Sequence, residues 1–172
     1  EMTGELANGW LGTSFMPEQA DIFLAPLLRG LAKSGRTLAD IDVQVGGSLE
    51  IDDDVERLIE ARRPAMAFTL GGMGSAKTNF YNDAFKRAGY AEAAEEVQAL
   101  WVSGDKEAAI RAVPDEMVLK TNLIGTREMI VERIKAYAAA GVTTLRISTS
   151  GRNWRERTET LAEATDLIHS IQ

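Results

Sequence analysis

The sequence contains no cysteine and only one histidine, His169. The absence of cysteine excludes a disulfide framework, a thiolate nucleophile and a cysteine-ligated metal site. The histidine has no second histidine or cysteine with which to share a metal, and the acidic run at 52–54 lacks the ligand spacing of a calcium loop. We therefore expect no metal.

An excess of positive charge and a long apolar run are also lacking. The 172 residues carry a formal net charge of −7, from 19 basic and 26 acidic side chains. This acidity argues against nucleic acid or an anionic membrane as the main partner. No apolar stretch approaches the roughly 18 residues that a membrane-spanning helix needs. We expect no nucleic acid, no membrane and a cytoplasmic location.

The clearest pattern that is present is a strict alternation over residues 42–51, which predicts a strand. One face of this strand is apolar, and the other carries small and polar side chains. Two further strands are predicted at 10–13 and 142–149, and the later one alternates in the same way.

Helical patterns fill the intervals between these strands, with one continuous helical excursion from about 54 to 140. Strands separated by helices predict a parallel sheet with right-handed crossovers. A polar face opposite a helix-covered face is how a closed (β/α) barrel lines its ligand mouth. Three strands cannot close a barrel, so the predicted fold is α/β, a single partial barrel domain over residues 1–172.

The first residues have a pattern typical of the middle of a protein. Residues 1–7 resemble the last turns of a helix, Asn8 and Gly9 suit a turn, and a strand follows at once. A further strand is expected to precede that helix, so we expect this chain to be one part of a larger protein.

Three stretches resemble the luciferase-like monooxygenase family, in particular its deazaflavin-dependent oxidoreductases. They are GELANGWLGT at 4–13, GGMG at 71–74 with NFYND at 79–83, and AYAAAGVTTL at 136–145. Members of the family are about twice this length and form an eight-stranded TIM-type (β/α)8 barrel. The resemblance implies the C-terminal half of that barrel, with three parallel strands (six to eight) and a long helical insertion between the last two.

The resemblance also implies an activity. Such enzymes transfer a hydride between a small organic substrate and either FMN or the deazaflavin coenzyme F420 (F-420). Most of their catalytic side chains lie on the earlier strands, so the catalytic residues are expected outside this chain, and this stretch alone is expected to be inactive. The implied partners are a small-molecule substrate, the N-terminal half of the barrel and a second copy in a homodimer.

Candidate cofactor-binding residues follow the first predicted strand. Thr13 and Ser14 lie where a barrel strand ends, and the resemblance implies that they approach the cofactor or substrate. The alternative is that they cap the helix that starts at Pro17.

Candidate substrate-side residues lie on the polar faces of the other two strands or just after them. Glu50 and Arg146 are expected to come within pairing distance, because an unpaired arginine inside a barrel is costly. An internal salt bridge without chemistry is the alternative that we favour for this pair. Arg152 follows the last strand and could hold an anionic group, although a solvated loop arginine is the more common case. The full set is Ser48, Glu50, Arg146, Ser148 and Arg152.

One segment supports a different function. GGMGSAKT at 71–78 differs by one residue from the G-x-x-x-x-G-K-[ST] loop that cradles phosphates in NTP-binding proteins, and the apolar stretch 65–70 before it could be a strand. Ala76 replaces the second glycine, and no later strand ends in an aspartate for magnesium. A turn between two helices is the alternative. The third hypothesis is a noncatalytic fragment that needs its other half to bind anything.

Overall fold

The computed structural model describes residues 1–75, 77–149, 151 and 153–171. They divide into two compact units, which are described one at a time. The first unit combines Glu1–Asp53 with Thr121–Gln172, and the second is the continuous segment Asp54–Lys120.

The first unit is built on a parallel sheet whose central strand is β2 (Asp42–Ile51). Along one edge of β2 runs β4 (Thr144–Thr149), paired from Gln44↔Thr144 to Leu49↔Thr149. The other edge is shared by two short strands. The first, β1 (Gly9–Leu11), pairs with the start of β2, and β3 (Leu123–Gly125) pairs with its end.

Hydrogen bonds at the two ends of β2 confirm this arrangement. The N–H of Gly12 donates to the carbonyl of Gln44 (2.8 Å) and the N–H of Asp52 to that of Gly125 (3.0 Å), whereas the N–H of Thr143 donates to Val43 (3.0 Å). In a parallel strand, successive residues direct their backbone groups to opposite edges. The backbone N–H and carbonyl groups of the even-numbered residues of β2 therefore point toward β1 and β3, and those of the odd-numbered residues point toward β4.

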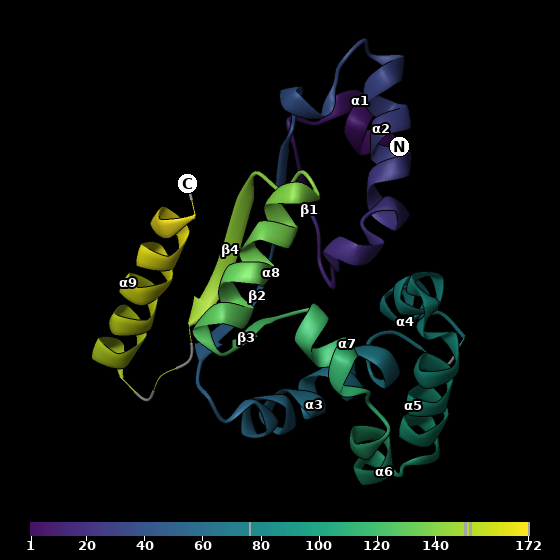
Figure 1. Cartoon of the computed structure of the whole chain (residues 1–172). Helices are drawn as coiled ribbons and strands as arrows, with labels where there is room; N and C mark the ends of the chain where they lie inside the picture. The colour runs from purple at the N-terminus through teal and green to yellow at the C-terminus, as the bar shows by residue number, and fades with distance from the viewer. Residues whose placement is uncertain (76, 150, 152, 172) are drawn as a thin grey trace. The chain divides into compact units, whose positions relative to one another are not determined.

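Helices α2 (Asp21–Lys33), α8 (Arg127–Ala139) and α9 (Trp154–Ser170) pack their buried residues against one face of this sheet, and Figure 1 shows α8 in front of the strands. The predicted alternation is confirmed, because Val43, Val45 and Leu49 are fully buried against these helices. The remaining helical elements of this unit are short: α1 (Met2–Leu6), the 3-10 turns η1 (Pro17–Gln19) and η2 (Leu38–Asp40).

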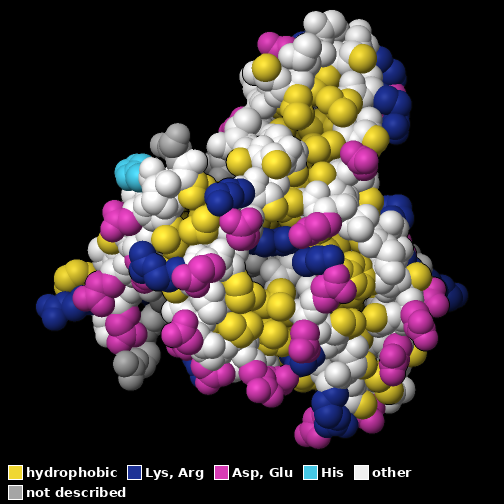
Figure 2. All heavy atoms as spheres, viewed as in Figure 1, with side chains coloured by type: hydrophobic (Ala, Val, Ile, Leu, Met, Phe, Trp, Pro, Cys, Tyr) yellow, Lys and Arg dark blue, Asp and Glu magenta, His cyan; other side chains and the backbone are white. Residues whose placement is uncertain are grey.

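Two glycines let α1 cross α2 at backbone distance. A Cβ on Gly4 would lie 2.1 Å from the carbonyl oxygen of Leu27, and one on Gly30 would lie 1.8 Å from that of Glu1. No larger residue fits at either position without moving a helix. Exposed apolar side chains, among them Met2, Leu6 and Leu28, gather over these two helices (Figure 2).

The regular elements among the described residues of the second unit are helices, apart from an isolated bridge between Ser75 and Thr78. Its elements are α3 (Val55–Gly71), α4 (Phe80–Phe85), the π-helical turn η3 (Lys86–Tyr90), α5 (Ala91–Ser103), α6 (Lys106–Arg111) and α7 (Asp115–Lys120). Side-chain caps begin three of these helices, supplied by Asp54, Asn79 and Asp105. A capping side chain accepts from an N–H that the first turn leaves unpaired, which fixes where the helix starts.

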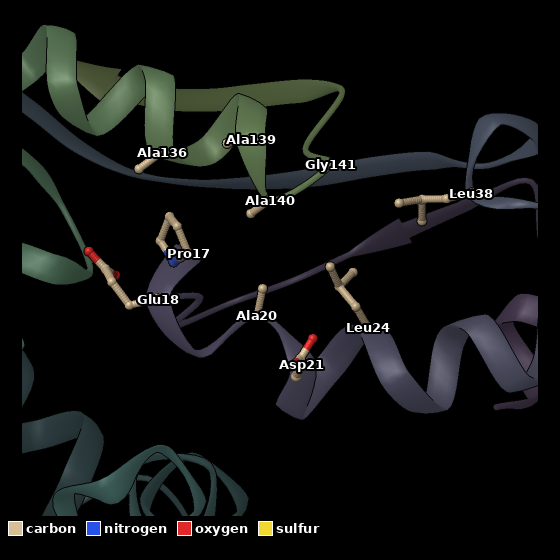
Figure 3. A pocket seen from close by; sticks show the side chains of 10 residues that line it. All are labelled: Pro17, Glu18, Ala20, Asp21, Leu24, Leu38, Ala136, Ala139, Ala140 and Gly141. Atoms are coloured by element: carbon tan, nitrogen blue, oxygen red, sulfur yellow. The ribbon is translucent and has the colours of Figure 1, made fainter.

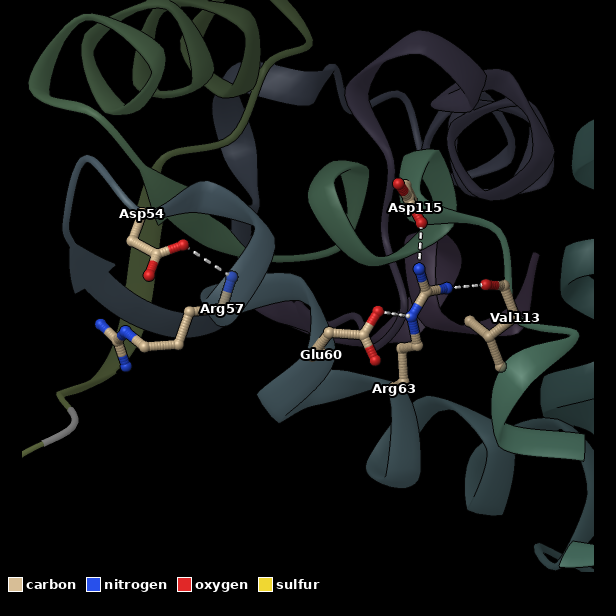
Figure 4. A network of polar contacts seen from close by, with 6 residues as sticks. All are labelled: Asp54, Arg57, Glu60, Arg63, Val113 and Asp115. Atoms are coloured by element: carbon tan, nitrogen blue, oxygen red, sulfur yellow. Dashed lines mark hydrogen bonds and ion pairs between the residues drawn. The ribbon is translucent and has the colours of Figure 1, made fainter. Parts of the chain in front are cut away.

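Polar side chains link the helices of this unit, among them those of Asn82 and Arg63. The buried Asn82 amide donates to the carbonyls of Leu70 (2.9 Å) and Ala94 (2.7 Å), and so links α4 to α3 and α5. The guanidinium of Arg63 on α3 contacts Glu60, the carbonyl of Val113 and the carboxylate of Asp115 at the start of α7 (Figure 4).

The predicted fold class is confirmed in its main features, with one addition. The sheet has four parallel strands among the described residues, not three, because β3 lies inside the segment predicted to be helical from 54 to 140. This strand has only three residues, all of them buried, and so it shows no alternation that could distinguish it from a helical stretch.

We predict that Gly46→Ala lowers the free energy of unfolding by about 1–3 kcal/mol or more, the usual cost of overpacking. A Cβ at Gly46 would lie 1.6 Å from the carbonyl oxygen of Arg146, so β2 and β4 would have to separate. Gly9→Ala is the matched control, because its Cβ would approach Asp42 only to 3.3 Å. Urea unfolding, monitored by circular dichroism, measures the free energy of unfolding of both variants. Equal losses in the two variants would contradict the prediction.

We also predict that Arg63→Met destabilises the helical unit by about 1–3 kcal/mol, because it removes charge-assisted hydrogen bonds from a side chain that is only 13% exposed. Arg111→Met is the control. Its side chain is 70% exposed and reaches Glu107 only at 3.9 Å, so its effect should stay below about 0.5 kcal/mol. Thermal unfolding of the two variants measures the difference.

Candidate functional site

The face of the sheet opposite α2, α8 and α9 carries the polar side chains of β2 and β4. Ser48 lies directly beside Ser148 in the register, and Gly46 lies beside Arg146. Partners in a parallel pair point to the same face, so two hydroxyls and a guanidinium share one surface with Gly46, which adds no side chain to it. Ser148 and Arg146 are exposed and Ser48 is half-buried.

The predicted pairing of Glu50 with Arg146 is wrong. Arg146 is opposite Gly46, and Glu50 lies four residues further along β2, which is about 13 Å at the rise of a strand. The alternation correctly placed both residues on the polar face, since Leu145 and Ile147 pack against the core. The offset between the strands sets the distance, and alternation within one strand contains no information about that offset.

Thr13 and Ser14 follow the first strand, as predicted, although β1 ends at Leu11 and Gly12 lies between. Ser14 has a φ of 53°, and it is the one non-glycine with a positive φ in the described part of the chain. Neither residue caps a helix: η1 begins after Met16, and α2 after Ala20, without a side-chain cap at either start. The capping alternative is therefore wrong, and the backbone outlier makes this turn a candidate functional site. Arg152 lies outside the described residues.

A second polar cluster lies at the amino end of the same two strands. The Asp42 carboxylate accepts from the hydroxyls of Thr143 and Thr144 and from the amide of Gln44. The hydrogen bond from Thr143, followed by those from Gln44 and Thr144, lowers the pKa of Asp42. In parallel barrels the carboxyl end is the catalytic end and the amino end serves stability, so we assign this cluster a structural role.

A hollow of 510 Å³ lies in the helix layer and not on the polar face (Figure 3). Alanines of α8 face Pro17 and Ala20 across it, and Glu18 and Asp21 are the two carboxylates of its lining. Thr13, Ser14, Ser48 and Ser148 are not among the residues that line this hollow, so it is separate from the candidate site.

The glycine-rich segment that resembles a phosphate-binding loop has the wrong surroundings. Residues 65–70, predicted as a possible strand, belong to α3, which ends at Gly71, and α4 starts at Phe80. Between them, the Ser75 hydroxyl accepts from the N–H groups of Lys77 (3.3 Å) and Thr78 (3.0 Å). A phosphate loop of this type connects a strand to a helix, so the turn between helices is the correct interpretation and the NTP-binding alternative is not supported.

Neither a metal cluster nor a membrane-spanning helix occurs among the described residues. Among them, no three histidine, aspartate or glutamate side chains come together in a way that could hold a metal ion. None of the helices in the described part of the chain is both long and apolar enough to cross a membrane.

Comparison with known proteins identifies the family. The model of the luciferase-like monooxygenases matches residues 1–144, and the chain belongs to this family. It is 31% identical over 144 residues to a Mycobacterium tuberculosis protein with the provisional name coenzyme F420-dependent oxidoreductase. It is 30% identical over 141 residues to the 5,10-methylenetetrahydromethanopterin reductase of Methanopyrus kandleri. These matches cover 83% and 81% of this chain, but only 42% and 38% of the two relatives.

Solved structures agree with this assignment. The fold matches the coenzyme F420-dependent tetrahydromethanopterin reductase of Methanopyrus kandleri with a TM-score of 0.73 and 25% identity, over 99% of this chain and 47% of that one. It also matches an F420-dependent secondary alcohol dehydrogenase with a TM-score of 0.60, at an identity of 11% that supports the fold alone. The chain thus has the fold of part of a TIM-type barrel, and it spans less than half the length of its relatives.

Sequence reasoning missed Gly46 and the Asp42 cluster. Glycine inside a strand pattern indicates a bulge or a close backbone approach, and Gly46 and Gly47 both lie inside the predicted strand. The Asp42 cluster depends on the register that places Thr143 and Thr144 beside it, and no local pattern contains that information.

We predict that Asp42 stabilises the fold in a pH-dependent way. Because its pKa is lower in the folded state, the contribution is present above the unfolded-state pKa of about 3.9 and is lost as the pH falls through the folded value. The wild type should therefore melt at a higher temperature than Asp42→Asn at pH 7. This difference in melting temperature should disappear below about pH 4. Asp166→Asn, at an exposed position of α9, should show no such convergence. Melting temperatures across this range measure the effect.

Proposed function

We propose that this chain is part of a coenzyme F420-dependent oxidoreductase, which transfers a hydride between the deazaflavin and a small organic substrate. Residues 1–172 would form one partial barrel domain, completed by an N-terminal half. The main support is the fold match to an F420-dependent reductase over 99% of the chain, together with a relative at 31% identity whose name includes coenzyme F420. FMN is the weaker choice, because none of these names mentions it.

The chemistry of the polar face fits such a cofactor. F420 supplies the carrier for the hydride and brings a flat ring and negatively charged groups. Gly46, Ser48 and Ser148 give this face little side-chain bulk, so a flat ring could approach the sheet closely. Arg146 is exposed on the same face beside them, and it offers a positive charge to an anionic group on the cofactor or substrate.

Within this proposal, the residues of this chain bind and orient, and the proton- and hydride-handling groups belong to the other half. Thr13 and Ser14 approach the cofactor from the end of β1, and Ser48, Glu50, Arg146 and Ser148 form the substrate side. A noncatalytic fragment that needs its other half to bind anything is the second candidate. The homodimer and the cytoplasmic location predicted from the sequence stay predictions.

Titration of F420 into the protein tests the proposal. The fluorescence of the deazaflavin should be perturbed on binding to the product of the full reading frame that contains this sequence. We predict that Arg146→Met weakens this affinity about tenfold, which corresponds to the loss of one charge-assisted contact. Arg29→Met is the control, because Arg29 lies in the same unit at an exposed position of α2, where it pairs with Glu1, and it should leave the affinity unchanged.

The same titration distinguishes the oxidoreductase proposal from the noncatalytic fragment. No binding of F420 or FMN by the full product would contradict the oxidoreductase proposal. Binding by the full product but none by residues 1–172 alone supports the view that this chain supplies only one wall of the site. An intact mass equal to 18.7 kDa for the native protein would favour the noncatalytic fragment.

A further inference from the structure

The turn after β1 holds Ser14 in a backbone conformation that L-residues avoid. At φ 53°, the Cβ of Ser14 lies too close to the following carbonyl oxygen, and only glycine and, to a lesser degree, asparagine or aspartate adopt this region readily. Such an outlier persists only when the surrounding structure forces it. The neighbours of Ser14 therefore have to supply the constraint.

The constraint begins with the burial of the next two residues. Phe15 is 2% exposed and Met16 is 3% exposed, so the chain after Ser14 is anchored in the core. The ring of Phe15 contacts those of Trp10 and Phe23, each with centroids 6.0 Å away. It also stacks on Tyr137 of α8, at 6.1 Å and an interplanar angle of 25°.

Tyr137 contacts the turn through both its ring and its hydroxyl. The hydroxyl lies 3.5 Å from the carbonyl oxygen of Phe15, to which it donates a weak hydrogen bond. Burial raises the pKa of Tyr137, so this hydroxyl keeps its proton. The whole side chain is 1% exposed, and it is one of the largest fully buried groups of the chain.

Arg133, one turn before Tyr137 on α8, makes the second contact to this segment. We call Tyr137 and Arg133, with their partners Phe15 and Glu18, the clamp. The guanidinium of Arg133 lies 5.5 Å from the centre of the Tyr137 ring, and it forms an ion pair with both carboxylate oxygens of Glu18 in η1, one of them at 3.2 Å. The segment Gly12–Gln19 is thus held to α8 at Phe15 and at Glu18, on the far side of Ser14 from β1.

We propose that Tyr137 is a positioning residue, which holds the Thr13–Ser14 turn in the conformation that binds the cofactor. This inference rests on the proposed function. Tyr137 acts through Phe15 and does not itself approach the ligand. Its contribution is the energy that keeps Ser14 in the left-handed region when no ligand is present, so that the ligand meets a turn already formed.

A rescue experiment tests the proposal. Tyr137→Leu removes the stacked ring and the hydroxyl, and the affinity for F420 is expected to fall about tenfold because the turn relaxes to ordinary angles. Ser14→Asn, which tolerates positive φ better and keeps a polar side chain, is expected to restore most of the affinity in the Tyr137→Leu background. Arg133→Met is a milder second variant, in case Tyr137→Leu does not fold.

Leu167→Ala is the matched control. Leu167 is buried in the same core, and it lies on α9 and not on the clamp. It should lower the melting temperature without changing the affinity. A loss of affinity that Ser14→Asn does not restore, or one that Leu167→Ala reproduces, would mean that Tyr137 serves stability alone.

The φ of Ser14 in crystal structures of the variants gives a reading that does not depend on the cofactor. It should become negative in Tyr137→Leu and stay positive in the wild type. If it stays positive without Tyr137, the positioning role is overturned. If the wild type binds no F420, the proposed function fails, and the φ values still decide whether Tyr137 holds the turn.

Discussion

The pairing of β2 along both of its edges is the interaction on which the sheet-containing unit depends. β4 occupies one edge, and β1 and β3 share the other, so every strand of the sheet contacts β2. The alternation of β2 buries Val43, Val45 and Leu49 under α2, α8 and α9, which leaves the polar residues on the opposite face. Gly46 permits this arrangement, because any side chain there would collide with the backbone of β4.

The candidate site follows from the same strand. Since partners in the register point to one face, the pairing that buries the apolar side chains also brings Ser48, Ser148 and Arg146 together. The turn after β1 is held by a different means. Phe15 is inserted into an aromatic cluster and is stacked on Tyr137, and the ion pair of Arg133 with Glu18 holds the next turn of the chain. Rigid elements therefore position both parts of the proposed ligand surface, as an oriented binding site requires.

The family match and the fold match cover different lengths of this chain. The family match ends at residue 144, where β4 starts, so most of β4 and all of α9 lie beyond it. The fold match nevertheless covers 99% of the chain. Arg146 and Ser148 are therefore assigned to the proposed site by the geometry of the sheet and not by the family match.

The sequence by itself determined the class of fold, the polar and apolar faces of β2 and β4, and the position of Ser14 at the end of a strand, because alternation and turn residues are local patterns. It also carried the family resemblance. Tertiary structure alone decided that Glu50 lies far from Arg146, that residues 123–125 form a strand, and that Ser14 has a positive φ. Each of these depends on an offset between strands or on packing against residues more than 70 positions away, and a local pattern contains neither.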